Sequence, residues 1–315
     1  MNIVILESLA VAKDELASLK KPFEAEGHVF AEYERTSDIP QLIKQVKDAQ
    51  ALIVADMALP GDVIRGADHL QFIDVAFTGV DHIDLEAAKE KGVAVSNAAG
   101  YSNQAVAELA LGMSLSLARN MRETERSVRS GGTKEGLIGW EIQGKTVGIL
   151  GYGKIGRRTA ELFHAFGANI IASSRSYKDD AAEYVEQVDV DSLLQESDIV
   201  VLHVPLNDST RGMIDADKIA LMKSTAILIN VARGPVVNAQ DLADALNNDV
   251  IAGAGIDVFD QEPPLDLDEP LLQAKNTLVT PHIAFASEQS MSLRAQIVFE
   301  NLRKWLEGEQ ENVIL

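Results

Sequence analysis

Cysteine is absent from the 315-residue sequence, and positive charge is scarce in it. Without cysteine the chain has no disulfide framework, no thiol nucleophile and no thiolate metal site. The chain has 28 Lys and Arg residues and 48 Asp and Glu residues, which gives a formal net charge of −20. Nucleic acids and anionic membranes bind basic surfaces, so this balance argues against both kinds of partner. We expect a cytoplasmic protein without a bound metal ion, a location with which the absence of cysteine is compatible.

Long hydrophobic runs are also missing. No apolar stretch approaches the roughly 18 residues of a membrane-spanning helix. The most apolar one, residues 105–118, is interrupted by Glu108 and has helical periodicity. Residues 1–6 lack the basic segment of a signal peptide, and we expect them to form a buried strand. Hydrophobic residues make up 46% of the chain, which is enough to form real cores. The length of 315 residues allows two domains of ordinary size or one large domain.

Short apolar runs alternate with amphipathic stretches. In the first part of the chain we expect strands at 3–6, 29–30, 51–54, 72–75 and 93–95, with helices at 10–25, 39–47 and 85–91. A long helix at 100–119 and a second series follow, with strands at 146–150, 169–172, 199–202, 226–230, 253–257 and 277–279. This alternation predicts parallel sheets with helices on both faces. Periodicity leaves open whether the last helix, 287–307, packs back on the first domain.

A glycine-rich turn is the sharpest local signal. The strand at 146–150 leads into Gly151, Gly153 and Gly156, spaced as G-x-G-x-x-G, and we expect a helix at 157–166 after them. The first glycine permits a tight turn, the second lets a pyrophosphate approach the backbone, and the third lets helix and strand pack closely. The helix N-terminus offers N–H groups to phosphates. An ordinary glycine-rich turn is the alternative, but the strand before and the helix after favour dinucleotide binding.

The end of the next strand indicates which dinucleotide is bound. NAD sites usually carry Asp or Glu there, about 20 residues after the glycines, to hold the ribose 2′-OH. Here the strand ends in Ser174, Arg175 and Ser176, without a carboxylate. Arg and Ser donors suit a 2′-phosphate. We therefore favour NADP(H), with NAD(H) as the alternative. A surface arginine without a role is the other interpretation of Arg175.

Three polar residues follow apolar strands in the second half of the chain. His282 follows the strand at 277–279, Arg233 follows 226–230, and Glu262 comes after 253–257. Ligands of open α/β sheets bind beyond the carboxyl ends of the strands, so these side chains can converge over a nicotinamide. The alternatives are a surface salt bridge for Arg233 and a solvated acid for Glu262. His203 also ends a strand, and we interpret it as a structural histidine.

The chain resembles the D-isomer-specific 2-hydroxyacid dehydrogenases over nearly its whole length. The similarity lies in residues 79–84, 106–108, 144–146, 198–210 and 222–223, and in the segments around Arg233, Glu262 and His282. It implies two doubly wound parallel-sheet α/β domains. A Rossmann cofactor domain at 99–284 would be inserted in a discontinuous, flavodoxin-like substrate domain at 1–98 and 285–315. It also implies a homodimer, paired through the cofactor domain with the helix at 102–119 involved.

The resemblance further implies the chemistry, a hydride transfer between NAD(P)H and a small 2-oxo or 2-hydroxy acid. His282 would be the general acid/base, Glu262 would pair with it, and Arg233 would hold the substrate carboxylate. Asp257 would orient the nicotinamide carboxamide. Substrate contacts would come from Met57, Thr78, Gly79, Arg233 and His282. Further cofactor contacts would come from Val106, Lys154, Ile155, Val204, Pro205, Thr210, Val231, Ala232, Arg233, Asp257, His282 and Ala284.

The substrate is the least determined point. The loop after residues 51–54 contributes to the substrate pocket in this family, and phosphoglycerate dehydrogenases usually carry Arg-Ser there. This chain has Asp56 and Met57, and a carboxylate repels a phosphate, so 3-phosphoglycerate is disfavoured. The Ser174-Arg175 pair after the second cofactor strand resembles that of the NADPH-preferring glyoxylate/hydroxypyruvate reductases, which are the branch of the family that we favour. Aromatic or branched 2-oxoacids, a phosphoglycerate dehydrogenase-like enzyme and a non-enzymatic NAD(P)H-sensing regulator remain alternatives.

Overall fold

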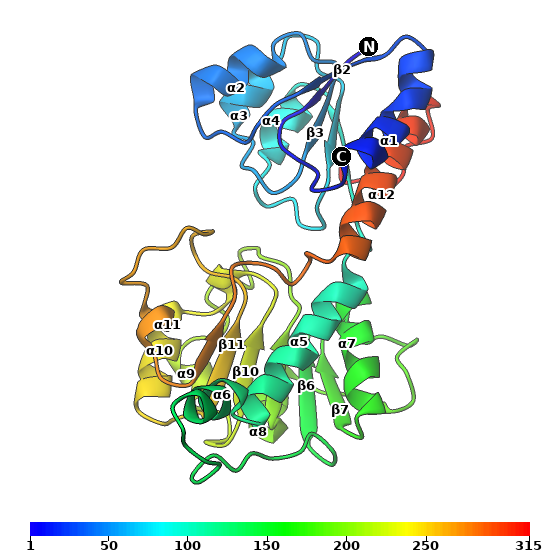
Figure 1. The fold of residues 1–315 in the computed structure, drawn as a ribbon. Helices are drawn as coiled ribbons and strands as arrows, with labels where there is room; N and C mark the ends of the chain where they lie inside the picture. Colours follow the sequence, from blue (N-terminus) through cyan, green and yellow to red (C-terminus); the bar gives the residue numbers. More distant parts are fainter. The chain divides into compact units, whose positions relative to one another are not determined.

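The computed structural model describes residues 1–315. The chain divides into two compact units (Figure 1). One unit consists of Met1–Ser102 and Ala286–Leu315, and the other of Asn103–Phe285. The second unit is therefore inserted in the first. None of the helices combines the length and the apolar character needed to cross a membrane.

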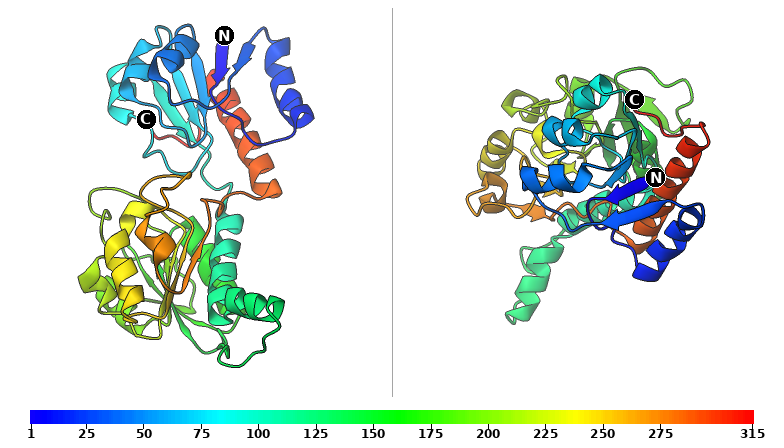
Figure 2. Two further views of the ribbon diagram at one scale, coloured as in Figure 1. Left: turned by 60° about the vertical axis from the view of Figure 1, so that its left-hand side comes forward. Right: turned by 90° about the horizontal axis from the view of Figure 1, so that it is seen from above.

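The first unit is built on a five-stranded parallel sheet with the order β2-β1-β3-β4-β5. Its strands are β1 (Asn2–Ile5), β2 (Val29–Glu32), β3 (Ala51–Val54), β4 (Phe72–Val75) and β5 (Ala94–Asn97), and its helices are α1 (Lys13–Ala25), α2 (Ile39–Val46), α3 (Gly61–Gly66), α4 (Leu85–Glu90) and α12 (Glu288–Leu306). Strands β3 and β4 are buried along their whole length. Helix α1 packs with α12, whereas α2, α3 and α4 lie on the other side of the sheet (Figure 2). Burial of both faces explains why β3 is a continuous apolar run and why β4 contains a single polar residue, Asp74.

Helix α12 returns the end of the chain to the first sheet. It begins in a capping box in which the Ser287 side chain accepts a hydrogen bond from the Ser290 N–H. From its last turns Asn301 Nδ2 donates to Asp74 Oδ1 on β4 and to the Asn97 carbonyl on β5, both at 3.0 Å. The question that periodicity left open is thus answered, because the final helix does pack on the first unit.

The second unit contains a seven-stranded parallel sheet with the order β12-β11-β10-β9-β6-β7-β8. Its strands are β6 (Thr146–Leu150), β7 (Asn169–Ser173), β8 (Val185–Gln187), β9 (Ile199–Leu202), β10 (Ile227–Asn230), β11 (Gly253–Ile256) and β12 (Thr277–Val279). Its helices are α5 (Asn103–Ala118), α6 (Met121–Arg129), α7 (Lys154–Ala165), α8 (Val190–Glu196), α9 (Ala216–Ile219), α10 (Ala239–Asn247) and α11 (Pro270–Gln273), with a 3-10 turn η1 (Gly234–Val236). The strand order reverses between β6 and β9. Two doubly wound parallel-sheet units, one inserted in the other, confirm the predicted fold class.

Differences from the expected elements have local causes. Helix α7 starts at Lys154, inside the glycine motif, rather than at 157. Helix α6 was not expected, because it buries none of its residues and so carries no apolar stripe toward a core. The short strand β8, on the sheet edge, and the two-turn helix α3 were also not expected.

Candidate active site

The glycine motif forms the turn between β6 and α7, beside the point where the strand order reverses. Gly151 has a φ of +105°, and a Cβ atom there would lie 2.6 Å from the carbonyl carbon of His203. A Cβ on Gly156 would lie 2.1 Å from the Gly151 carbonyl oxygen, whereas one on Gly153 would meet nothing within 4 Å. The first and third glycines therefore allow the turn and its packing, and the second leaves the backbone open to a ligand.

The start of α7 has the properties of a phosphate site. Gly153 is its N-cap residue, and no side chain caps the helix there. The N–H groups of the first turn and the positive end of the helix dipole then favour an anion. Together with the open backbone at Gly153, this arrangement fits the pyrophosphate of a dinucleotide, which Gly151, Gly153, Lys154, Ile155 and Gly156 would hold.

The candidate 2′-phosphate residues lie directly beside this turn. The Gly151 N–H donates to the Ser173 carbonyl at the end of β7, at 2.8 Å. Ser174, which follows, is half-buried, and Arg175 and Ser176 are exposed. The glycine turn and the Ser-Arg-Ser segment thus share one edge of the sheet, as expected.

A buried asparagine organises the turn that carries Arg233. Asn230, at the end of β10, accepts from the Ala232 N–H at 3.1 Å and donates from Nδ2 to the Arg233 carbonyl at 3.0 Å. A Cβ on Gly234 would lie 2.0 Å from the carbonyl carbon of Phe259. The turn after β10 therefore packs tightly on the segment after β11, and this packing fixes the backbone from which Arg233 projects.

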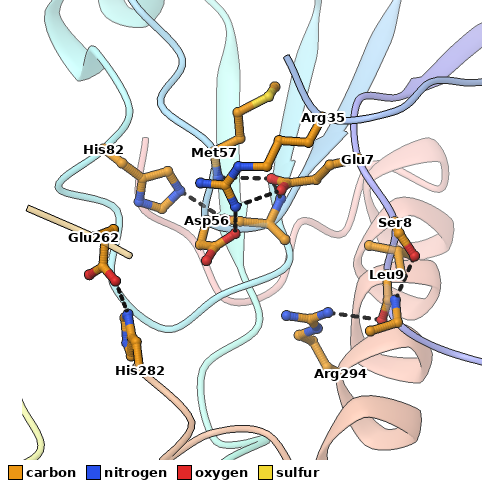
Figure 3. A network of polar contacts seen from close by, with 12 residues as sticks. Glu7, Ser8, Leu9, Arg35, Asp56, Met57, His82, Glu262, His282 and Arg294 are labelled. Atoms are coloured by element: carbon orange, nitrogen blue, oxygen red, sulfur yellow. Dashed lines mark hydrogen bonds and ion pairs between the residues drawn. The ribbon is translucent and has the colours of Figure 1, made fainter. Parts of the chain in front are cut away.

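His282 and Glu262 form a hydrogen-bonded pair. His282 Nδ1 lies 2.8 Å from Glu262 Oε2 (Figure 3). The His282 side chain is 11% exposed, and its ring meets that of Phe285 edge-on at a centroid distance of 5.2 Å. His282 has a φ of +56°, which is uncommon for a residue other than glycine. A histidine whose Nδ1 is held by a carboxylate is suited to proton transfer at Nε2.

Asp257 holds the turn that carries His282. Its Oδ1 accepts from Thr280 Oγ1 at 2.5 Å and from the Ile283 N–H at 2.8 Å, and its Oδ2 accepts from the Ala284 N–H at 2.8 Å. The Asp257 carbonyl accepts from the His282 N–H at 2.8 Å. Burial raises the pKa of Asp257, and these hydrogen bonds oppose the rise. Both carboxylate oxygens are thus engaged within the protein, an anchoring role that the sequence did not indicate.

The other residues expected around the cofactor belong to the same unit. Val106, Val231 and Ala284 lie in one hydrophobic cluster, against which Ile155 packs, and Val204 and Ala232 pack against another. The Thr210 hydroxyl donates to the Pro205 carbonyl at 2.6 Å and accepts from the Asn207 N–H at 2.9 Å, so it stabilises its own loop.

His203 fits the interpretation of a structural histidine. Its Nε2 lies 2.8 Å from Thr159 Oγ1 on α7. Burial lowers the pKa of His203 to about 3, so the ring is neutral near pH 7 and poorly suited to proton exchange there.

In the first unit, the residues expected at the substrate lie on turns after β3 and β4. Met57 is buried after β3, and Thr78 and the half-buried Gly79 follow β4. Asn97 Nδ2 donates to the Thr78 carbonyl at 2.6 Å. The Thr78 hydroxyl oxygen is buried and has no hydrogen-bond partner in the protein. Because buried polar atoms are rarely left unpaired, this hydroxyl is a candidate contact for a polar ligand.

A charged network that sequence reasoning missed holds the turn at Met57 (Figure 3). Glu7, just after β1, is 4% exposed, and its Oε1 accepts from the N–H groups of Ala55 and Met57, both at 2.8 Å. Arg35, after β2, contacts Glu7 Oε2 at 3.4 Å and Asp56 Oδ1 at 2.6 Å. Burial raises the pKa of Glu7, and the backbone N–H groups oppose the rise. Asp56 is therefore one member of a network with two carboxylates and one guanidinium, and not an isolated charge.

The sequence could have indicated this network by the positions of its residues relative to the predicted strands. Glu7, Arg35 and Asp56 each follow a strand of one sheet, and the carboxyl ends of parallel strands share an edge. The same rule would have singled out Asn230, which ends β10.

A glycine turn that fits a dinucleotide, with Arg, Glu and His after neighbouring strands, defines a nicotinamide-dependent oxidoreductase. Comparison with known proteins supplies the family. The profile of the D-isomer specific 2-hydroxyacid dehydrogenase, NAD binding domain, matches residues 111–284. The chain belongs to the D-isomer specific 2-hydroxyacid dehydrogenases, which are NAD(P)-dependent oxidoreductases.

Individual relatives differ in their named activities. A hydroxypyruvate reductase from Blautia hydrogenotrophica is 34% identical, over 100% of this chain and 99% of that protein. A D-3-phosphoglycerate dehydrogenase from Methanocaldococcus jannaschii is 40% identical over 87% of this chain, which spans only 53% of that protein. An acyclic imino acid reductase in complex with NADPH and D-Arg is similar in structure, with a TM-score of 0.92, 27% identity and complete coverage of both chains.

Proposed function

We propose that this enzyme reduces a small 2-oxoacid to the D-2-hydroxy acid, with NADPH as the preferred cofactor. The observation that carries this proposal is the His282–Glu262 pair, which lies at the carboxyl edge of the sheet that also presents the glycine turn. A bound nicotinamide cofactor would supply the hydride. The second unit, Asn103–Phe285, would bind the cofactor, and the first unit, Met1–Ser102 with Ala286–Leu315, would bind the substrate.

His282 acts as the general acid in this mechanism. With Nδ1 held by Glu262, its Nε2 carries the proton that passes to the C2 oxygen as the hydroxy acid forms. Arg233 binds the substrate carboxylate and polarises the keto oxygen through its planar guanidinium group. The first unit would contribute to substrate binding through the N–H groups near Thr78 and Gly79. Asp257 keeps the turn at His282 in place.

Hydroxypyruvate and glyoxylate are the substrates that we favour. A hydroxypyruvate reductase matches the whole chain. Glu7 occupies the N–H groups of Ala55 and Met57, and Asp56 adds a second carboxylate at the same turn. A substrate phosphate would meet these anions, with only Arg35 to offset them. This arrangement speaks against 3-phosphoglycerate, although one relative is a D-3-phosphoglycerate dehydrogenase.

The preference for NADP(H) rests on the residues after β7. Ser174, Arg175 and Ser176 offer two hydroxyls and a guanidinium beside the glycine turn, and no carboxylate stands among them to hold a ribose 2′-OH. A relative in structure binds NADPH.

We also propose that the protein is a homodimer paired through its second unit. Helix α6 has no buried residue, and it exposes Met121 (49%) and Val128 (70%). Ile138, in the loop that follows, is 88% exposed. Such apolar side chains on a helix that projects to solvent suit contact with a second copy of the chain.

Steady-state reduction of glyoxylate, hydroxypyruvate, pyruvate and phenylpyruvate, each with NADH and NADPH, tests the proposal. We expect the highest kcat/KM for hydroxypyruvate or glyoxylate with NADPH. Faster reaction with phenylpyruvate would overturn the substrate assignment, and a large advantage for NADH would overturn the cofactor preference. Tight dinucleotide binding without turnover of any 2-oxoacid would instead identify a sensing regulator.

A further inference from the structure

The segment after β7 is held in place at two points, at Lys178 and at Asp180. The edge strand β8 provides the first through Gln187, which lies opposite Ala172 of β7. The Lys178 N–H donates to Gln187 Oε1 at 2.8 Å, and Gln187 Nε2 donates to the Lys178 carbonyl at 2.9 Å. This pair of hydrogen bonds fixes the backbone at Lys178 to the sheet.

Arg157 provides the second point of attachment. From the first turns of α7, its Nη1 donates to the Asp180 carbonyl at 2.9 Å and its Nη2 to Asp180 Oδ1 at 2.6 Å. Its guanidinium carbon lies 4.7 Å from the ring centroid of Tyr152, the buried residue between Gly151 and Gly153. Arg157 therefore connects the phosphate-binding turn directly to the segment after β7.

Between the glycine turn and these attachments lie the candidate 2′-phosphate residues and one further cation. Lys178 Nζ donates to Ser176 Oγ at 3.3 Å, so the ammonium group folds back over the Ser-Arg-Ser segment. Because the Ser176 oxygen accepts this bond, its hydroxyl proton is available to donate to an anion. Two cations, Arg175 and Lys178, and two serine hydroxyls thus lie on one short turn.

The charges near this turn explain why the attachment matters. Asp179, Asp180, Glu183 and Glu186 follow Lys178 along the chain. Arg157 neutralises Asp180 and lowers its pKa through their hydrogen bond. Without Arg157 the turn would lose a fixed point, and an unpaired carboxylate would lie close to the expected phosphate.

We propose that Lys178 is a second 2′-phosphate-binding cation, and that Arg157, through Asp180, is the positioning residue that keeps Lys178 and Arg175 in place. This inference rests on the proposed use of NADP(H). Selectivity for NADP(H) would then depend on the contact between Arg157 on α7 and Asp180 as well as on the residues that bind the 2′-phosphate.

The test is calorimetric titration of the complete protein with 2′,5′-ADP and with 5′-AMP, which differ only in the 2′-phosphate. In Lys178→Met we expect 2′,5′-ADP to bind about tenfold more weakly, the usual cost of one charged hydrogen bond, with 5′-AMP unchanged. Arg157→Met should lower the preference for 2′,5′-ADP in the same direction. Arg158→Met is the matched control, because Arg158 is the next residue on α7 but pairs with Glu161 and Gln104; its ratio of the two affinities should equal that of the wild type.

The possible results distinguish the roles of Lys178 and Arg157 from the proposed use of NADP(H). If the wild type prefers 2′,5′-ADP and the Lys178→Met variant keeps the same preference, the role of Lys178 is overturned, while the use of NADP(H) stands. Equal weakening of both ligands in Arg157→Met would show a general adenosine contact and overturn the positioning role. A wild type without any preference would overturn the NADP(H) assignment together with this inference, while leaving 2-oxoacid reduction to be judged by the turnover assay.

Discussion

Replacement of Glu7 tests the network that fixes the turn after β3. In Glu7→Ala the N–H groups of Ala55 and Met57 lose their common acceptor in a buried site, where these residues are 3% and 4% exposed. An unsatisfied buried donor costs about 1 to 3 kcal/mol, so two such donors cost about 2 to 6 kcal/mol. In Glu7→Gln the amide oxygen can still accept both bonds. We therefore expect a large effect of alanine and a small effect of glutamine.

Amide hydrogen exchange over residues 51–60, measured by mass spectrometry, compares the local stability of this turn in Glu7→Ala and Glu7→Gln. A cost of about 2 kcal/mol corresponds to exchange roughly thirtyfold faster at the affected amides. Arg35→Met is a control, because Arg35 is 53% exposed and its ion pairs should contribute little to the protection of these amides. Unchanged exchange in Glu7→Ala, or equally fast exchange in Glu7→Gln, would refute the reasoning. If the turn contacts substrate, Glu7→Ala should also raise the KM for the 2-oxoacid.

Three further variants test other parts of the account. Arg233→Ala should raise the KM for the 2-oxoacid about tenfold or more and lower kcat in steady-state assays, and an unchanged KM would exclude a carboxylate contact. Burial raises the pKa of Asp74 well above its ordinary value of 3.8. The folded protein therefore binds the carboxyl proton more tightly than the unfolded chain does, and the stability of the wild type falls as the pH rises above the ordinary value toward the raised one. The Tm of Asp74→Asn relative to that of the wild type should therefore increase as the pH rises above about 4, and a Tm difference that does not vary with pH would contradict this. A Val128→Asp/Ile138→Asp double variant should be monomeric by light scattering while the wild type is dimeric; a double variant that stays dimeric would exclude the α6 surface.

Much of the fold was predictable because both sheets are parallel and buried. Strands β3, β4, β6, β9 and β12 have the predicted bounds. Their mainly apolar runs, separated by polar turns, leave little freedom in their assignment. Helix α6 and strand β8 were missed because neither needs a core-facing apolar stripe: one projects to solvent and the other is a three-residue sheet edge.

In the site, residues with unusual chemistry at strand ends were predictable, and residues that act through the backbone were not. The sequence singled out His282 and Glu262 by position, and the structure places them in hydrogen-bond contact. Glu7, Asn230 and Asp257 hold turns through backbone N–H and carbonyl groups. Their positions after strands could have singled out these residues, but the backbone groups that they bind depend on which turns meet in space, and no local pattern in the sequence specifies that.

Loss of the His282 imidazole is the most direct test of the central claim, that His282 supplies the proton in NADPH-dependent 2-oxoacid reduction. The measurement is kcat for hydroxypyruvate in the wild type and in His282→Ala, with NADPH binding followed by calorimetry in the same preparations. Because general acid–base catalysis contributes about 10²–10⁴-fold, we predict that kcat falls by that factor while NADPH binding persists. A His282→Ala variant that turns over hydroxypyruvate at nearly the wild-type rate would contradict the account.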